Sequence, residues 1–261
     1  MKRFIFLVLF LVVSIIVQAQ DDAAELAKKL ANPIAALISV PFQNNTDYGI
    51  GEWHGTRNTL NFQPVIPIGI SKNMNMITRV VVPIVTQYNI NGVGEKQNGL
   101  GDAVVSAFFS PVNAEKLTWG VGPALLIPTG TSNSLTAKKF GFGPTAVALK
   151  QVNGWTIGGL INQIWSIAGS EERPDVSQMF IQPFVVFNWK TGAGAGANLE
   201  WTQNWKAGTT ILWLNPNISA VTSLGKQKTQ FVMGPRLNLA APDGGKADWG
   251  WRAVVIFLFP K

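Results

Sequence analysis

Apolar and polar residues alternate along most of the chain from about residue 37 onward. Twelve segments show this pattern, and turn-forming residues such as Gly, Asn, Asp and Ser separate them. Alternation with one apolar face indicates a β-strand, and about ten tilted residues cross the hydrocarbon layer of a membrane. The predicted strands lie near 37–45, 57–68, 75–88, 100–110, 117–128, 141–151, 155–168, 178–189, 194–204, 209–221, 229–240 and 249–259.

The apolar faces of these segments carry Trp and Phe and hardly any charge. Near 178–189, for example, Ile181, Val185 and Phe187 share a face that opposes Gln182 and Asn188. A periplasmic β-sandwich also alternates, but its outer face should carry many Lys and Glu. We therefore predict an all-β fold, a closed antiparallel transmembrane barrel of about twelve strands. Tryptophans near the predicted strand ends are expected to form an interfacial girdle: Trp119, Trp155, Trp189, Trp201, Trp213 and Trp249.

The composition agrees with a wall that faces lipid. Charged residues make up 13% of the chain and hydrophobic residues 47%, whereas soluble proteins average about 25% charged residues. The chain contains no Cys and a single His. These counts exclude disulfide scaffolds and thiolate metal sites, and they leave little room for His-based catalysis.

The first residues have the composition of a targeting signal. Lys2 and Arg3 precede an apolar run from Phe4 to Val17, and Ala19 supplies the small residue of a cleavage site. This run is shorter than the roughly 20 residues of a spanning helix, so we predict a secretory signal peptide at 1–19. Cleavage of this segment would remove Lys2 and Arg3 and so reduce the formal net charge from +7 to +5. The remaining cations are scattered, so we expect no nucleic-acid partner.

Residues 20–36 are predicted to form a short helical segment ahead of the barrel at 37–261. Asp21 and Asp22 open the run, Lys28 and Lys29 lie near its end, and Pro33 stops it. The segment could plug the periplasmic mouth of the barrel or form a disordered leader, and the sequence leaves both open.

Proline conflicts with part of this pattern. Pro64, Pro83, Pro183 and Pro216 lie inside predicted strands, where each removes a backbone donor. Gly-Pro pairs recur at 122–123, 143–144 and 234–235, near predicted strand starts. Bulges are expected to accommodate some of these prolines.

Side chains that alternate along each strand with the apolar, lipid-facing positions should face the inside of the barrel. These inward side chains define the candidate site. They combine three arginines with two carboxylates, so selectivity for charged solutes is not indicated. Inward apolar residues (Phe180, Phe184, Val254, Ile256 and Leu258) favour a small hydrophobic solute over free ion flow. Alternatively, the charges pair with one another and fill a barrel that transports nothing. The residues predicted to line the lumen are Arg79, Asp102, Gln182, Asn188, Asn198, Glu200, Arg236, Asn238 and Arg252.

An enzymatic function finds weak support. A Ser–His mechanism needs a base beside a nucleophile, and His54 has only Thr56 two residues away. Asp102 and Glu200 are not identified as a catalytic pair, because their separation is unknown. The glycine-rich run at 191–198 lacks the Lys and the following helix of a phosphate-binding loop, so it indicates a hairpin turn. We predict no catalytic residues, no metal and no cofactor.

Several stretches resemble a family of bacterial outer-membrane proteins. They are 32–51, 55–70, 99–111, 120–131, 141–151 and the closing DWGWRAVVIFLFPK at 248–261. The family is related to transporters described for the phenol-degradation meta-pathway, and some members carry the label neuromedin U. The resemblance implies a barrel in the outer membrane of a Gram-negative bacterium and a porin-like role in passing small, hydrophobic or aromatic molecules. A structural or adhesive barrel is the alternative, and a lipid hydrolase is less favoured. The expected partners are outer-membrane lipid, a small-molecule solute and the barrel-assembly machinery, whose C-terminal aromatic signal would here be Phe259.

Overall fold

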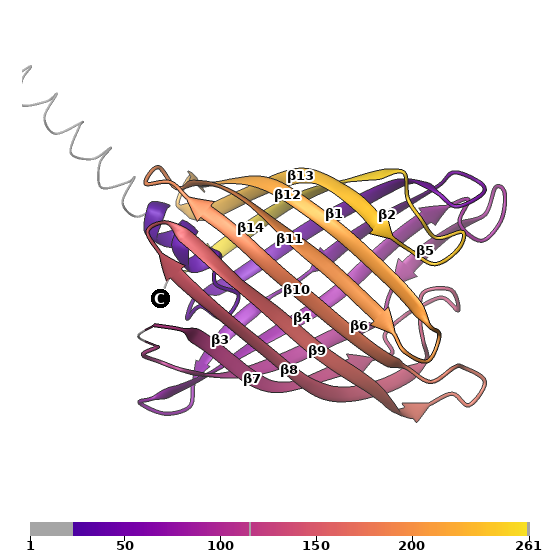
Figure 1. Cartoon of the computed structure of the whole chain (residues 1–261), viewed down its shortest axis with the longest axis horizontal. Coiled ribbons are helices and arrows are strands. Elements are labelled where there is room, and N and C mark those ends of the chain that lie inside the picture. The colour runs from indigo at the N-terminus through magenta and orange to yellow at the C-terminus, as the bar shows by residue number, and fades with distance from the viewer. Residues whose placement is uncertain (1–22, 115, 260–261) are drawn as a thin grey trace, which may run out of the picture.

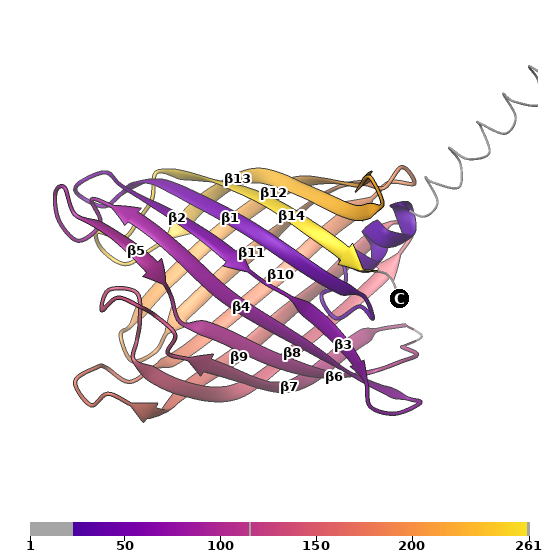
Figure 2. The ribbon, with the colours of Figure 1, turned by 180° about the vertical axis from the view of Figure 1, so that it is seen from behind.

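A single antiparallel sheet closes on itself to form a tilted barrel with a short helix at one end (Figures 1 and 2). The structure is a computed structural model that describes residues 23–114 and 116–259. The predicted signal peptide at 1–19 lies outside the described residues. No helix within the described ranges is long and apolar enough to cross a membrane, a finding that does not bear on strands.

The strands follow one another around the barrel in chain order. β1 and β14 close the wall through register pairs that run from Ile38↔Phe259 to Tyr48↔Trp249. The strand bounds are β1 (Ile38–Ile50), β2 (Gly55–Phe62), β3 (Val65–Gly69), β4 (Met74–Tyr88), β5 (Lys96–Leu100), β6 (Ala103–Pro111), β7 (Thr118–Ile127), β8 (Lys139–Val152), β9 (Trp155–Gly169), β10 (Ser177–Asn188), β11 (Ala193–Asn204), β12 (Thr209–Leu224), β13 (Gln227–Ala240) and β14 (Trp249–Phe259).

Fourteen strand segments make a twelve-stranded barrel because two of its strands are interrupted. β2 and β3 pair with β4 in one continuous register, from Thr56↔Tyr88 to Gly69↔Asn75. β5 and β6 likewise pair with different halves of β4, and their registers differ by one residue. The predicted closed antiparallel barrel of about twelve strands is confirmed.

Prolines lie where the ladders are interrupted. Pro64 separates β2 from β3, and the amide of Gly101 between β5 and β6 donates to the carbonyl of Pro83 at 2.8 Å. The β10–β11 ladder skips the position of Pro183, and the β12–β13 ladder skips that of Pro216. Because proline has no backbone donor, each interruption falls where the wall already lacks a hydrogen bond.

The outer wall is apolar and rich in aromatic rings. Trp155 and Trp189 are 46% and 47% exposed near one end of the barrel, and Trp249 and Trp251 are 53% and 44% exposed near the other. Such rings at both ends suit the two interfaces of a membrane. A closed barrel with this wall is a transmembrane barrel of the bacterial outer membrane.

Trp213 departs from the predicted girdle. It pairs across the sheet with Glu200, whose side chain is inside the barrel, and its ring lies under the guanidinium of Arg236 at 4.3 Å. The prediction that Trp213 faces the interface is therefore wrong. The positively charged guanidinium of Arg236 gives the indole of Trp213 a polar partner inside the lumen.

The two ends of the barrel differ in their connections. Two-residue turns at 153–154 and 225–226 lie at the end that carries the helix, and longer loops at 89–95, 128–138 and 241–248 lie at the other. Outer-membrane barrels have short periplasmic turns and longer extracellular loops. The helix therefore lies at the periplasmic end.

Candidate functional site

The N-terminal segment lies inside the periplasmic mouth of the barrel. Its helix, residues 23–30, buries Leu26 and Ala27 against Leu37, Val221 and Leu258. Two side chains of the wall bind its backbone: Gln151 Nε2 donates to the carbonyl of Lys28 at 2.8 Å, and Asn188 Nδ2 donates to that of Ala27 at 3.4 Å. Of the two readings that the sequence left open, the structure shows a plug.

The chain after the helix reaches further into the lumen. Ile34 is 4% exposed and joins an apolar cluster with Phe108, Leu149 and other inward side chains of β4, β8 and β9. Phe180 and Phe184 of β10 pack against the same cluster. We call residues 23–37 the plug, because they lie inside the periplasmic mouth of the lumen and pack against its wall.

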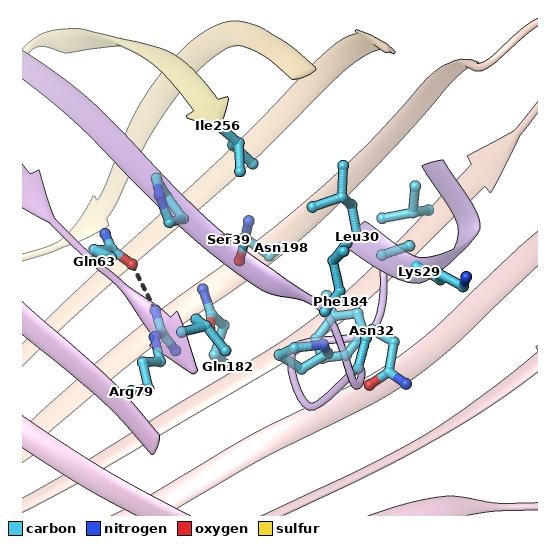
Figure 3. A pocket seen from close by; sticks show the side chains of 17 residues that line it. Lys29, Leu30, Asn32, Ser39, Gln63, Arg79, Gln182, Phe184, Asn198 and Ile256 are labelled. Carbon is cyan, nitrogen blue, oxygen red and sulfur yellow. Dashed lines mark hydrogen bonds between the residues drawn. The ribbon is translucent and has the colours of Figure 1, made fainter. Parts of the chain in front are cut away.

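A cavity of about 250 Å³ lies between the plug and the wall (Figure 3). Its apolar lining includes Leu30 and Leu37 of the plug with Val65, Phe184 and Ile256 of the wall. Polar side chains lie at both ends of the cavity in Figure 3, with Lys29 and Asn32 near the helix and Gln63, Arg79 and Gln182 at the end away from it. The cavity thus combines an apolar lining with polar groups at each end.

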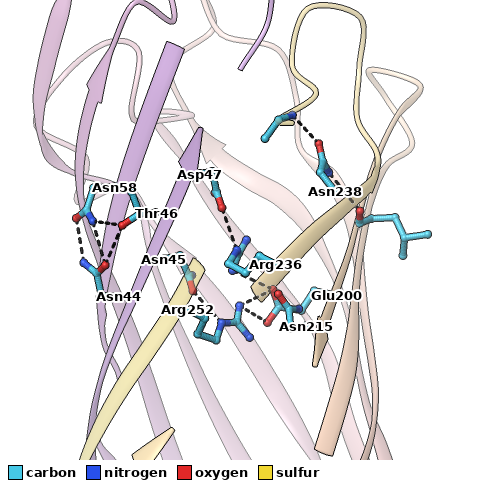
Figure 4. A network of polar contacts seen from close by, with 12 residues as sticks. Asn44, Asn45, Thr46, Asp47, Asn58, Glu200, Asn215, Arg236, Asn238 and Arg252 are labelled. Carbon is cyan, nitrogen blue, oxygen red and sulfur yellow. Dashed lines mark hydrogen bonds and ion pairs between the residues drawn. The ribbon is translucent and has the colours of Figure 1, made fainter. Parts of the chain in front are cut away.

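Beyond the cavity, toward the extracellular end, paired charges follow the inner wall from β11 to β1 (Figure 4). Arg236 Nε donates to Asp47 Oδ1 at 3.0 Å, and its Nη1 lies 3.8 Å from Glu200 Oε2. Arg252 pairs with Glu200 at 2.9 Å and donates through Nε to Asn45 at 2.8 Å. The arginine side chains are each 5% exposed, so buried carboxylates balance buried cations.

The remaining predicted residues take more local roles. Asn238 accepts from the amide of Ala247 at 2.9 Å and fixes the loop at 241–248, while Asn198 accepts from Asn215 at 3.0 Å. Asp102 accepts from the amides of Gly130 and Ala137 at 3.0 and 2.6 Å. Asp102 therefore holds the loop at 128–138 rather than joining the ion network.

Sequence reasoning missed three charged or aromatic members of the lumen. Asp47 lies beyond the predicted end of the first strand at residue 45, although it continues the inward series from Ser39 to Asn45. Arg57, whose Nε donates to Gln87 at 2.9 Å, opens β2 on the inward face. Trp213 was assigned to the outer surface. Extending the alternation by one or two residues would have found Asp47.

The geometry gives little support to hydrolase chemistry. His54 lies in an extracellular turn with its side chain 82% exposed, and its Nδ1 is 4.0 Å from Asp248. No hydrogen bond joins His54 and Thr56 in the part of the chain that the structure describes. Within the same ranges no group of His, Asp and Glu side chains could hold a metal ion.

Comparison with known proteins gives fold likenesses only. No protein-family profile and no curated protein matches the sequence. The chain is similar to the solved structure of the COG4313 outer membrane channel from Pseudomonas putida F1, with a TM-score of 0.67 and 14% identity over 85% of this chain and 94% of that one. It also matches OmpT, an outer membrane protein of Vibrio cholerae, with a TM-score of 0.40 and 7% identity over 85% of this chain and 98% of that one.

Proposed function

We propose that the chain is an outer-membrane channel or transporter for small hydrophobic molecules and that it has no enzymatic activity. The observation that carries the proposal is the cavity of about 250 Å³ inside the lumen, whose lining is more apolar than polar. Ligand sites are usually concave and apolar with a few polar groups that fix orientation. The resemblance to transporters described for phenol degradation points to the same class of solute. Outer-membrane lipid, the assembly machinery and this solute are the proposed partners.

Passage requires a change at the plug. Residues 23–37 lie inside the periplasmic mouth of the lumen, and Leu26, Ala27 and Ile34 are nearly inaccessible to solvent. Because the plug lines the cavity on its periplasmic side, a shift of this segment would widen the way out toward the periplasm. The plug precedes the first strand and forms no part of the sheet, so it can move without breaking the strand ladder.

The test measures entry of a hydrophobic dye into cells. A Gram-negative host expresses the wild type, a variant without residues 23–36, or neither, and uptake of N-phenyl-1-naphthylamine is followed by fluorescence. We expect faster uptake with the wild type than without the protein, and faster still with the deletion. Release of a periplasmic enzyme controls for general damage to the membrane. Equal uptake in all three strains would contradict the proposal.

A matched substitution separates plug docking from mere truncation. Ile34→Asp places a charge among apolar side chains of the lumen and should release the plug. Glu25→Gln changes the helix at a side chain that is 64% exposed and should leave uptake unchanged. Single-channel currents of purified protein should be small in the wild type and larger in Ile34→Asp.

A structural barrel without transport is the second candidate, and the ion network favours it. Asp47, Arg236, Glu200 and Arg252 interlock along the inner wall from β11 to β1, so these charges satisfy one another rather than a solute. Absence of both dye uptake and current in the wild type and in the plug deletion would support this candidate over the channel.

A further inference from the structure

Arg79 differs from the two paired arginines of the ion network because it lacks a carboxylate partner. Its Nη2 donates to Gln63 Oε1 at 2.7 Å, and this is its one side-chain hydrogen bond to the described residues. Within residues 23–114 and 116–259 no Asp or Glu oxygen lies within 4.0 Å of it. A guanidinium carries five N–H donors, so most of its donors are left for another molecule.

The side chain of Arg79 belongs to the cavity wall. Arg79 lines it together with Gln63, Gln182 and Asn198, and Figure 3 shows the guanidinium directed toward Gln63 at the end away from the helix. Lys29 is the other cation of the lining, but it is bound to Glu25 at 2.6 Å and its side chain is half exposed. Arg79 therefore places a positive charge at this end of the cavity. Glu200 attracts it only from beyond ion-pair distance and is itself paired with Arg252 and Arg236.

Arg79 is partly buried, and a carboxylate is the best-matched partner for a guanidinium in such a site. Arginine and carboxylate form two parallel charge-assisted hydrogen bonds, which add specificity as well as energy. The apolar part of the lining includes Leu37, Val65, Phe184 and Ile256, and Lys29, Asn32 and Ser39 add polar groups to it. Since an apolar cavity of about 150 Å³ admits benzene, about 250 Å³ admits a substituted aromatic ring.

We propose that the cavity binds small amphipathic carboxylates, with Arg79 holding the carboxylate and the apolar wall holding the hydrocarbon body. This inference rests on the proposed transport function and names the solute class within it. The sequence analysis found no indication of selectivity for charged solutes. This inference revises that expectation, because Arg79 places a positive charge at the cavity itself.

The test compares an acid with its neutral amide on purified protein in detergent. Binding of 3-phenylpropionate and of 3-phenylpropionamide is measured by titration calorimetry at pH 7.5, where the acid is ionised. We expect the wild type to bind the acid at least tenfold more tightly. Arg79→Met should abolish this preference while leaving the amide's affinity unchanged, and Arg79→Lys should retain part of it. Arg57→Met is the matched control, because Arg57 lies in the lumen outside this cavity.

Each outcome is decisive for the inference. Equal affinity for acid and amide in the wild type would overturn it and would indicate that water alone solvates Arg79, and this comparison needs no variant. An acid preference that survives in Arg79→Met, or disappears equally in Arg57→Met, would also overturn it. If the amide binds and the dye enters cells but the acid is not preferred, this inference fails and the channel stands. If neither compound binds and no dye enters, the proposed function itself fails.

Discussion

Asp47 shows how one carboxylate supports a cation inside the barrel. Its side chain is 9% exposed and accepts from Arg236, which is 5% exposed. Asp47→Asn keeps an oxygen near Arg236 but removes the charge. Removing one partner of a buried pair leaves the other uncompensated, so we expect a loss of about 3 kcal/mol in the free energy of unfolding.

The loss can be measured by urea titration of protein folded into vesicles, with tryptophan fluorescence as the signal. Asp248→Asn is the control, since that side chain is 68% exposed. Should Asp47→Asn cost no more than Asp248→Asn, the network would have no role in stability.

Asp175 provides a prediction about pH outside the membrane. The Lys139 ammonium donates to it at 3.0 Å and, with the Ser166 hydroxyl, lowers the pKa of this carboxyl below its ordinary value of 3.8. A carboxylate with a lowered pKa stabilises the fold above its unfolded pKa, and the benefit disappears as the pH falls through the folded pKa.

We therefore expect the melting temperature of the wild type to exceed that of Asp175→Asn at neutral pH. The difference should shrink as the pH falls below 3.8. Melting curves of both proteins over a pH series would check this, and a difference that grows on acidification would contradict it.

Residue-level predictions from sequence succeeded where the alternation was unbroken. Arg252, Glu200 and Arg236 were assigned inward from parity, and the structure brings them together. Parity cannot reveal which inward residues pair, because β11 and β14 are distant in the chain. It also failed for Trp213, whose ring contacts a cation rather than an interface. The sequence also could not show that Arg79 forms no ion pair with a described carboxylate, because that depends on distances between side chains in the folded barrel.

At the level of elements, the strands were readable because lipid imposes strict alternation. The predicted segment at 155–168 differs from β9 (Trp155–Gly169) by one residue. The two interruptions, at β2–β3 and β5–β6, were not predicted as such. A proline marks each place, but only the pairing with β4 shows that both halves belong to one strand.

The Gly-Pro pair at 143–144 has a structural reason in the contact between β8 and β9. A Cβ at Gly143 would overlap the carbonyl oxygen of Gln163 on the neighbouring strand. Gly143→Ala must push the two strands apart, and we expect it to cost about 2 kcal/mol in the free energy of unfolding.

A second glycine provides the comparison for this substitution. A Cβ at Gly69 would lie 3.8 Å from Asn75 Oδ1, an ordinary contact, so Gly69→Ala should be tolerated. The same urea titration measures both variants. Similar costs for the two would show that close approach at Gly143 is not what requires glycine.

For the whole molecule, closure of the sheet follows from the solvent that the wall faces. A backbone in lipid must satisfy its hydrogen bonds internally, and an open edge cannot do so. Pairing of β1 with β14 removes that edge, and the plug then closes one end of the lumen with apolar contacts. Sequence could predict the closed wall on these grounds, whereas the plug depended on packing that only the folded barrel creates.

The position of the wall in the membrane gives the last prediction, because the cost of a charge depends on depth. Ile161 faces outward near the middle of β9, and Leu224 faces outward at the periplasmic end of β12; they are 43% and 53% exposed. Arginine on the lipid face costs about 2–4 kcal/mol at the midplane and about 0–1 kcal/mol near the interface. We therefore expect Ile161→Arg to destabilise the barrel in vesicles far more than Leu224→Arg. In a water-soluble protein both exposed sites would tolerate arginine, so equal and small costs would show that this wall does not contact lipid.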